Sequence, residues 1–102
     1  MTDLSAAMDK ATQVLEKLRG LDDKVGGDAK LQTQIQDATT ALGTLELDDI
    51  EADQAQIDQL NQQLDTVDQS VSDALKGLAE IGTVISDVAG ALEILDKIAG
   101  IV

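Results

Sequence analysis

The chain has 102 residues, carries a net charge of −13 and contains no Phe, Trp, Tyr, Cys, His or Pro. Without aromatic residues it has no platform on which single-stranded bases could stack, and without Cys or His it lacks a thiolate nucleophile and the usual zinc, copper and haem ligands. Arg19 is its one arginine, so the charge argues against nucleic acids and anionic membrane surfaces as partners.

The first predicted element is a helix over residues 3–25. Its apolar residues recur in steps of three and four, which is the spacing of one helix face. Gly26 and Gly27 follow at once and are typical of a helix C-cap and turn, and Asp28 is suited to cap the next helix. The apolar stripe consists of Leu4, Ala7, Ala11, Val14, Leu18, Leu21 and Val25.

A second helix is predicted over residues 29–45, with the same spacing of apolar residues. From Leu45 to the next apolar seam position, Ile50, the step is five, so the stripe does not continue. Asp48, with Glu51 three residues later, has the pattern of a capping box and predicts a new helix start. The stripe of this second helix consists of Leu31, Ile35, Ala38, Leu42 and Leu45.

The third predicted helix covers residues 49–100 and carries a regular heptad seam. Gly77, Gly82 and Gly90 each cost about 1 kcal/mol inside a helix, but the seven-residue register passes through them unchanged. We therefore favour a helix that is continuous, or at most kinked near 77–82, over a hairpin at that point. The seam residues, which we expect to mediate oligomerisation, are Ile57, Leu60, Leu64, Val67, Val71, Leu78, Ile81, Ile85, Val88, Leu92 and Leu95.

These elements predict a single all-α domain spanning residues 1–102. It is either a coiled coil or an antiparallel bundle of two or three long helices. The apolar face of residues 78–102 is wider than that of residues 50–71, because Val84, Ala91 and Ile98 flank the seam there. We expect this wider face to need more than one neighbouring helix.

Charge is distributed unevenly, since residues 31–75 contain ten acidic residues and no basic one. No lysine in this segment can pair with its own acids, so apolar registry rather than charge pairing is expected to choose the partner. Any partner recognised by charge should be basic.

No catalytic, cofactor or metal site is predicted. The acidic group Asp48, Asp49, Glu51 and Asp53 could attract a hard cation, but we interpret it as the favourable first turn of a helix, and it lacks the EF-hand pattern. Acid–base chemistry would rest on carboxylates in no recognisable pocket context. We therefore expect the protein not to be an enzyme.

The predicted function is that of a non-enzymatic helical structural or assembly protein, which self-associates or scaffolds a helical partner through the seam residues. An alternative is a membrane-active amphipathic protein that inserts residues 78–102 into a bilayer. A lesser alternative is an acidic inhibitor that mimics DNA with the row Glu51, Asp58 and Asp65.

The start of the chain, MTDLSAAMDK, carries Asp3 and Asp9 where a secretory leader would be basic and then apolar. No stretch approaches the roughly 18 apolar residues of a membrane span. Neither feature identifies a compartment, and a cytoplasmic location is the default expectation.

Overall fold

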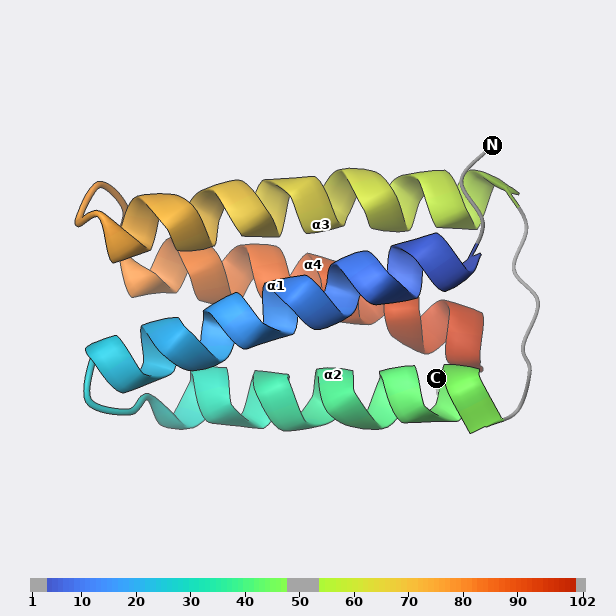
Figure 1. Ribbon diagram of the computed structural model, residues 1–102, viewed down its shortest axis with the longest axis horizontal. Helices are drawn as coiled ribbons and strands as arrows, with labels where there is room; N and C mark the ends of the chain where they lie inside the picture. Colours follow the sequence, from blue (N-terminus) through green and yellow to red (C-terminus); the bar gives the residue numbers. More distant parts are fainter. Residues whose placement is uncertain (1–3, 48–53, 101–102) are drawn as a thin grey trace.

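The computed structural model describes residues 4–47 and 54–100, which form four helices. These are α1 (Leu4–Lys24), α2 (Ala29–Leu47), α3 (Gln54–Leu75) and α4 (Ile81–Ala99), as Figure 1 shows. The prediction of an all-α helical bundle is confirmed. The prediction of two or three long helices is wrong, because the segment 49–100 contains two helices within its described part.

The turn between α1 and α2 was predicted correctly. Gly26 has a φ of 82°, a left-handed value that side chains with a Cβ rarely adopt. The amides of Gly26 and Gly27 donate to the carbonyls of Asp23 and Asp22, which is the Schellman pattern of helix termination. Asp28 then caps α2, because its Oδ1 accepts a hydrogen bond of 3.0 Å from the amide of Leu31.

A second turn of the same kind separates α3 from α4 and replaces the predicted kink. Gly77 has a φ of 78°, its amide donates to Ala74, and the amide of Leu78 donates to Asp73. These bonds complete another Schellman motif, so α3 ends at Leu75. The heptad register led to a wrong prediction because α4 also has apolar residues at the positions that flank the seam. These residues fit a second register over the same segment.

The four helices pack as two stacked hairpins, the first formed by α1 and α2 and the second by α3 and α4 (Figure 1). Helix α1 contacts α2 and α3, and α4 contacts α2 and α3, whereas the pairs α1/α4 and α2/α3 lie across the bundle diagonals. Figure 1 shows that α1 and α3 run in the same direction, as do α2 and α4. Both described turns therefore lie at the same end of the bundle, which measures 37 × 24 × 19 Å.

The two hairpins bury side chains at equivalent positions. Ala7 corresponds to Leu60 and Leu31 to Val84, an offset of 53 positions in both cases (60 − 7 and 84 − 31). The same offset pairs most other buried residues, although few of the paired residues are identical. The further pairs are Ala11 with Leu64, Val14 with Val67, Leu18 with Val71, Ile35 with Val88, Ala38 with Ala91, Leu42 with Leu95, and Leu45 with Ile98.

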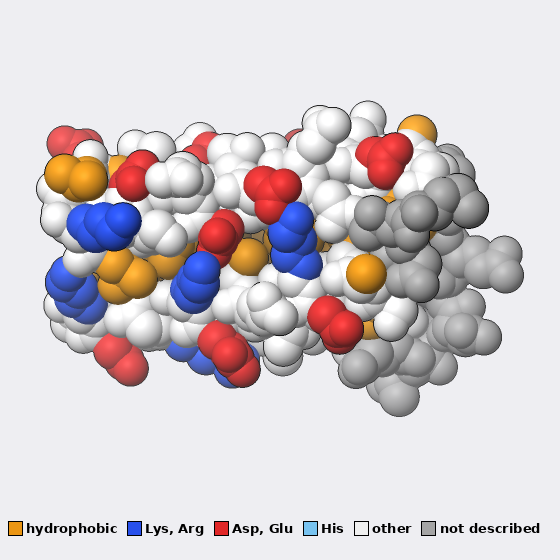
Figure 2. Space-filling model, turned by 45° about the horizontal axis from the view of Figure 1, so that its top comes forward, with side chains coloured by type: hydrophobic (Ala, Val, Ile, Leu, Met, Phe, Trp, Pro, Cys, Tyr) orange, Lys and Arg blue, Asp and Glu red, His pale blue; other side chains and the backbone are white. Residues whose placement is uncertain are grey.

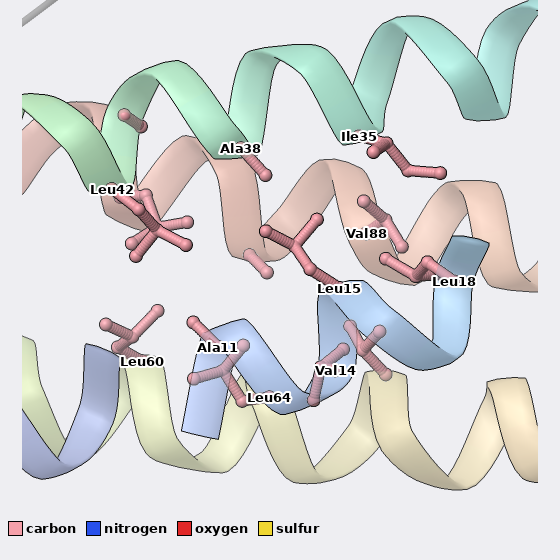
Figure 3. Close-up of a cluster of buried hydrophobic side chains, with 14 of the residues drawn as sticks. Ala11, Val14, Leu15, Leu18, Ile35, Ala38, Leu42, Leu60, Leu64 and Val88 are labelled. Atoms are coloured by element: carbon pink, nitrogen blue, oxygen red, sulfur yellow. The ribbon is translucent and has the colours of Figure 1, made fainter. Parts of the chain in front are cut away.

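The apolar core draws on all four helices and contains no buried polar or charged residue among the described parts of the chain. In Figure 3, Leu15 and Leu18 of α1 point toward Val88 of α4, while Val14 lies beside Leu64 of α3. Each fully buried Leu, Ile or Val side chain stabilises such a core by roughly 1.5–3 kcal/mol. The bundle is therefore held mainly by aliphatic packing.

Candidate interaction surfaces

The seam residues lie mostly inside the bundle. All five on α3 are buried, and on α4 so are Val88 and Leu95. Ile81 and Leu92 are partly buried against the core, Ile85 is half-exposed, and Leu78 is 75% exposed in the turn. Val84, Ala91 and Ile98, which we expected only to flank the seam, are buried instead. Within one chain, the buried seam residues therefore pack in the core between the two hairpins. Its predicted role in oligomerisation stays a prediction.

The interior contains a small gap between the four helices. A cavity of about 20 Å³ lies where Ala11, Ala38 and Ala91 meet larger side chains from all four helices. Its lining is aliphatic throughout, so it offers no hydrogen-bond partner to water or to a polar ligand. The gap is a packing defect of the size of one water molecule rather than a ligand site.

Charged side chains connect α1 to α3 along the surface. Lys10 Nζ lies 2.5 Å from Asp65 Oδ1, and Lys17 Nζ lies 2.5 Å from Asp68 Oδ1. Lys24, one heptad further along α1, donates to the carbonyl of Leu75 at the end of α3. Figure 2 shows the resulting neighbouring blue and red side chains along this side of the molecule. The lysines favour a parallel arrangement of α1 and α3 in this register.

We expected apolar registry rather than charge pairing to choose the partner of segment 31–75, and this stays a prediction, but within the chain α3 does form charge pairs. The acids have no basic neighbours in sequence, but the fold places the lysines of α1 against them. The spacing of seven between Lys10, Lys17 and Lys24 was the available signal. Counting charges segment by segment did not reveal these ion pairs, because the paired residues are 51 to 55 positions apart in the sequence (68 − 17 and 65 − 10).

Three acids of α3, Asp58, Asp65 and Asp68, lie on its α1 side. Asp58 and Asp65 border the same surface hollow as Lys10, and Asp68 meets Lys17. The proposed row of DNA-mimicking carboxylates is thus flanked by lysines in its described part, and Glu51 lies outside the described residues. The acidic group that could attract a hard cation also lies outside the described residues; it consists of Asp48, Asp49, Glu51 and Asp53.

The junction of α3 with α4 has polar contacts around one carboxylate, that of Asp87. Gln63 Nε2 donates a hydrogen bond of 2.8 Å to the carbonyl of Asp87, and the Ser70 hydroxyl contacts the Asp87 carboxylate. A Cβ added to Gly90 would lie 2.8 Å from Nε2 at the tip of the Gln63 side chain, so Gly90 leaves room for this glutamine. This junction differs from the charged α1/α3 junction in using amide and hydroxyl groups.

At the turn end, two large apolar side chains are exposed. Val25 is 46% and Leu78 is 75% exposed. Val25 precedes the left-handed glycine of its turn, Gly26, whereas Leu78 follows Gly77. In a Schellman motif an apolar residue after the glycine commonly packs on a residue of the last helical turn. For Leu78 that residue is the acid Asp73, which explains why Leu78 stays exposed.

Two features of the described residues bear on the alternative functions. No described helix is long and apolar enough to cross a membrane. Over residues 4–47 and 54–100, no group of three or more acidic side chains is placed to hold a metal ion. In comparisons with protein-family models, with curated proteins and with solved structures, nothing matches this chain.

Proposed function

We propose that the chain is a non-enzymatic helical assembly module that self-associates or scaffolds a helical partner. The observation that carries this proposal is the stacking of two equivalent hairpins, α1 on α3 and α2 on α4. Stacked helical hairpins are the units of extended scaffolds, in which each layer contacts only its neighbours. A stack of two layers keeps an outward side on each layer where further helices can pack.

The same proposal includes coiled-coil packing between the parallel neighbours α1 and α3. Val14 and Leu18 of α1 are buried at the positions equivalent to Val67 and Val71 of α3, in steps of three and four on both helices. Lys10 and Lys17 lie beside this stripe and pair with acids of α3, as flanking charges do in coiled coils.

The surface that would meet a partner differs from the one that the sequence suggested, which was the seam. Because the seam residues pack within one chain, a partner would meet the outer surfaces of the hairpins. Membrane activity stays an alternative prediction. It would require α4 to turn Val84, Val88 and Leu95 outward from the core, where they are now buried. Leakage of dye from liposomes would support that alternative.

Site-specific photo-cross-linking in the native cells tests the assembly function. A photoreactive residue is placed in turn at exposed positions of the four helices, such as Thr12, Thr33, Thr66 and Ser86. We expect a discrete adduct, with a second copy or with one other helical chain, from at least one position. No adduct from any position would contradict the function.

A further inference from the structure

We propose that two copies of this chain associate by exchanging hairpins. In the exchanged dimer, α1 and α2 of each copy pack on α3 and α4 of the other, so the bundle forms twice. This inference rests on the proposed assembly function and names a second copy as the partner. A closed chain offers a partner only its outer surfaces, and exchange adds a route through the apolar faces of the hairpins.

The structure shows what covers the apolar face of each hairpin. Helix α1 packs on α3 and α2 packs on α4, and the core between them contains no buried polar or charged residue among the described parts of the chain. The covering hairpin of a second copy has the same sequence as that of the first. It therefore fits an opened face as well as the hairpin of the same chain does.

Each hairpin is closed by its own turn and can move as a unit. The backbone hydrogen bonds of the turns at Gly26 and Gly77 join residues that are close in sequence. The hairpins are linked only where the chain passes from Leu47 to Gln54, at the end of the bundle opposite to the turns (Figure 1). Exchange therefore preserves the described contacts and changes only which copy this link leads to, which makes it a low-cost route to a dimer.

Side-chain size makes each hairpin select the other type of hairpin. Helix α1 buries Ala7 and Ala11 at the positions where α3 buries Leu60 and Leu64, and Ala11 and Leu64 line the same gap in the core (Figure 3). Two copies of the first hairpin would place alanine against alanine and leave a cavity. Two copies of the second would crowd leucine against leucine, and both arrangements cost stability.

Charge favours the same choice. The first hairpin, residues 4–47, has a net charge of −2 (5 − 7), and the second, residues 54–100, has a net charge of −6 (2 − 8). Two copies of the second hairpin would repel each other. The pairing of Lys17 with Asp68 forms only when a first hairpin meets a second one. An opened chain is thus expected to accept the second hairpin of another copy and not its first.

Concentration decides between the closed and the exchanged form. Two partners joined by a short flexible link experience an effective concentration of about millimolar. The closed chain therefore dominates at micromolar concentration, and the wild-type dimer forms at about millimolar concentration. A change that weakens the closed chain but not the dimer should lower this concentration.

Two charge-reversed variants meet that condition. The first carries Lys10→Asp and Lys17→Asp, and the second carries Asp65→Lys and Asp68→Lys. In either closed chain, like charges face each other at both ion-pair positions. When the two variants exchange hairpins, each first hairpin meets a second hairpin of opposite charge.

The two variants are unfolded in urea, mixed and refolded at about 0.05 M salt, so that the hairpins separate before they pack. Sedimentation equilibrium with interference optics then measures the mass, since the chain has no Trp or Tyr to absorb light. The mixture should reach twice 10.7 kDa at a concentration roughly a hundredfold below that of the wild type, because exchange relieves like-charge contacts in both chains. Each variant alone should stay at 10.7 kDa.

Two controls separate exchange from other causes. The first variant mixed with the wild type should stay at 10.7 kDa, because exchange between these two chains relieves no like-charge contact. A single chain with all four substitutions should also be monomeric. Its circular dichroism should match that of the wild type, which would show that the reversed pairs fit the fold.

A mixture of the two variants that stays at 10.7 kDa would overturn the exchange. If each variant is unfolded alone, a mixture that regains no helix on refolding would overturn it too. Equal dimerisation of the first variant with the wild type would place the association on another surface, so the exchange would be wrong and self-association would stand. Photo-cross-linking decides the proposed function separately, since a discrete adduct from an outer position supports that function even if no hairpins exchange.

Discussion

The two hairpins bury side chains at equivalent positions but differ in their surface residues. Both bury residues at positions offset by 53 (60 − 7 and 84 − 31), and both turns use a left-handed glycine in a Schellman motif, Gly26 in one and Gly77 in the other. Outside, the first hairpin supplies the lysines of α1, whereas the second supplies the aspartates of α3 that pair with them. The comparison teaches that apolar spacing and a few backbone positions specify this fold, while the surface is free to serve a function.

The largest expected effect comes from placing a charge at equivalent core positions. Ile35→Asp and Val88→Asp should each destabilise the bundle by several kcal/mol, because an unpaired carboxylate would be buried. Urea unfolding followed by circular dichroism measures the effect. The two losses should be similar if the hairpins are equivalent.

The adjacent residues provide the control for this pair. Gln36→Asp and Ala89→Asp change exposed positions one residue further along, which are again offset by 53 (89 − 36), and should be nearly silent. The equivalence would be broken if Ile35→Asp unfolded the chain while Val88→Asp left its urea midpoint unchanged.

Substitution of the turn glycines should have an intermediate effect. Gly26→Ala and Gly77→Ala should each cost about 1–2 kcal/mol, because a residue with a Cβ is strained at their positive φ. Neither added Cβ would meet an atom within 4 Å, so the cost is conformational alone. Gly43→Ala, in open space inside α2, should have the opposite sign and stabilise by up to about 1 kcal/mol. Thermal unfolding distinguishes the three variants.

The ion pairs that join the hairpins should contribute less. Lys17→Asp should destabilise by less than about 1 kcal/mol, because the Lys17 and Asp68 side chains are 47% and 41% exposed and salt screens their attraction. The double variant Lys17→Asp/Asp68→Lys should recover most of the loss at low salt. Failure of the double variant to recover stability would show that the pair does not specify how the hairpins align.

The smallest effect is expected at the exposed turn residues. Leu78→Ser and Val25→Ser should change the unfolding free energy by no more than about 0.5 kcal/mol, because neither side chain packs in the core. A loss of 2 kcal/mol on Leu78→Ser, measured by urea unfolding, would contradict this prediction and mean that Leu78 packs against the bundle.

Sequence reasoning succeeded where a local signal was unambiguous. The pair Gly26 and Gly27 and the cap Asp28 marked the first turn, and the spacing of apolar residues identified the buried faces of α1, α2 and α3. It failed at Gly77, where the glycine signal was weighed against an unbroken heptad register. In α4, residues such as Val84 and Ile85 support two overlapping registers, so spacing alone could not choose between them.

The polar contacts between helices could not be predicted, because they depend on which sides of the helices meet. The sequence shows the glutamines of α3 but not that Gln63 reaches Asp87 or that the aspartates turn to the lysines of α1. These pairings join residues 24 to 55 positions apart (87 − 63 and 65 − 10), and only the hairpin topology brings them together. The apolar positions repeat at an offset of 53 residues, and this signal is present in the sequence, but heptad spacing alone does not reveal it.

The most direct test of the stacked hairpins is zero-length carbodiimide cross-linking of the wild-type chain at micromolar concentration, followed by peptide mass spectrometry. The reagent joins a lysine to a carboxylate only where the two groups touch. We predict amide links between Lys10 and Asp65 and between Lys17 and Asp68 in the 10.7 kDa species. Their absence from this species, or their presence only in cross-linked dimers, would contradict the packing of α1 beside α3 within one chain.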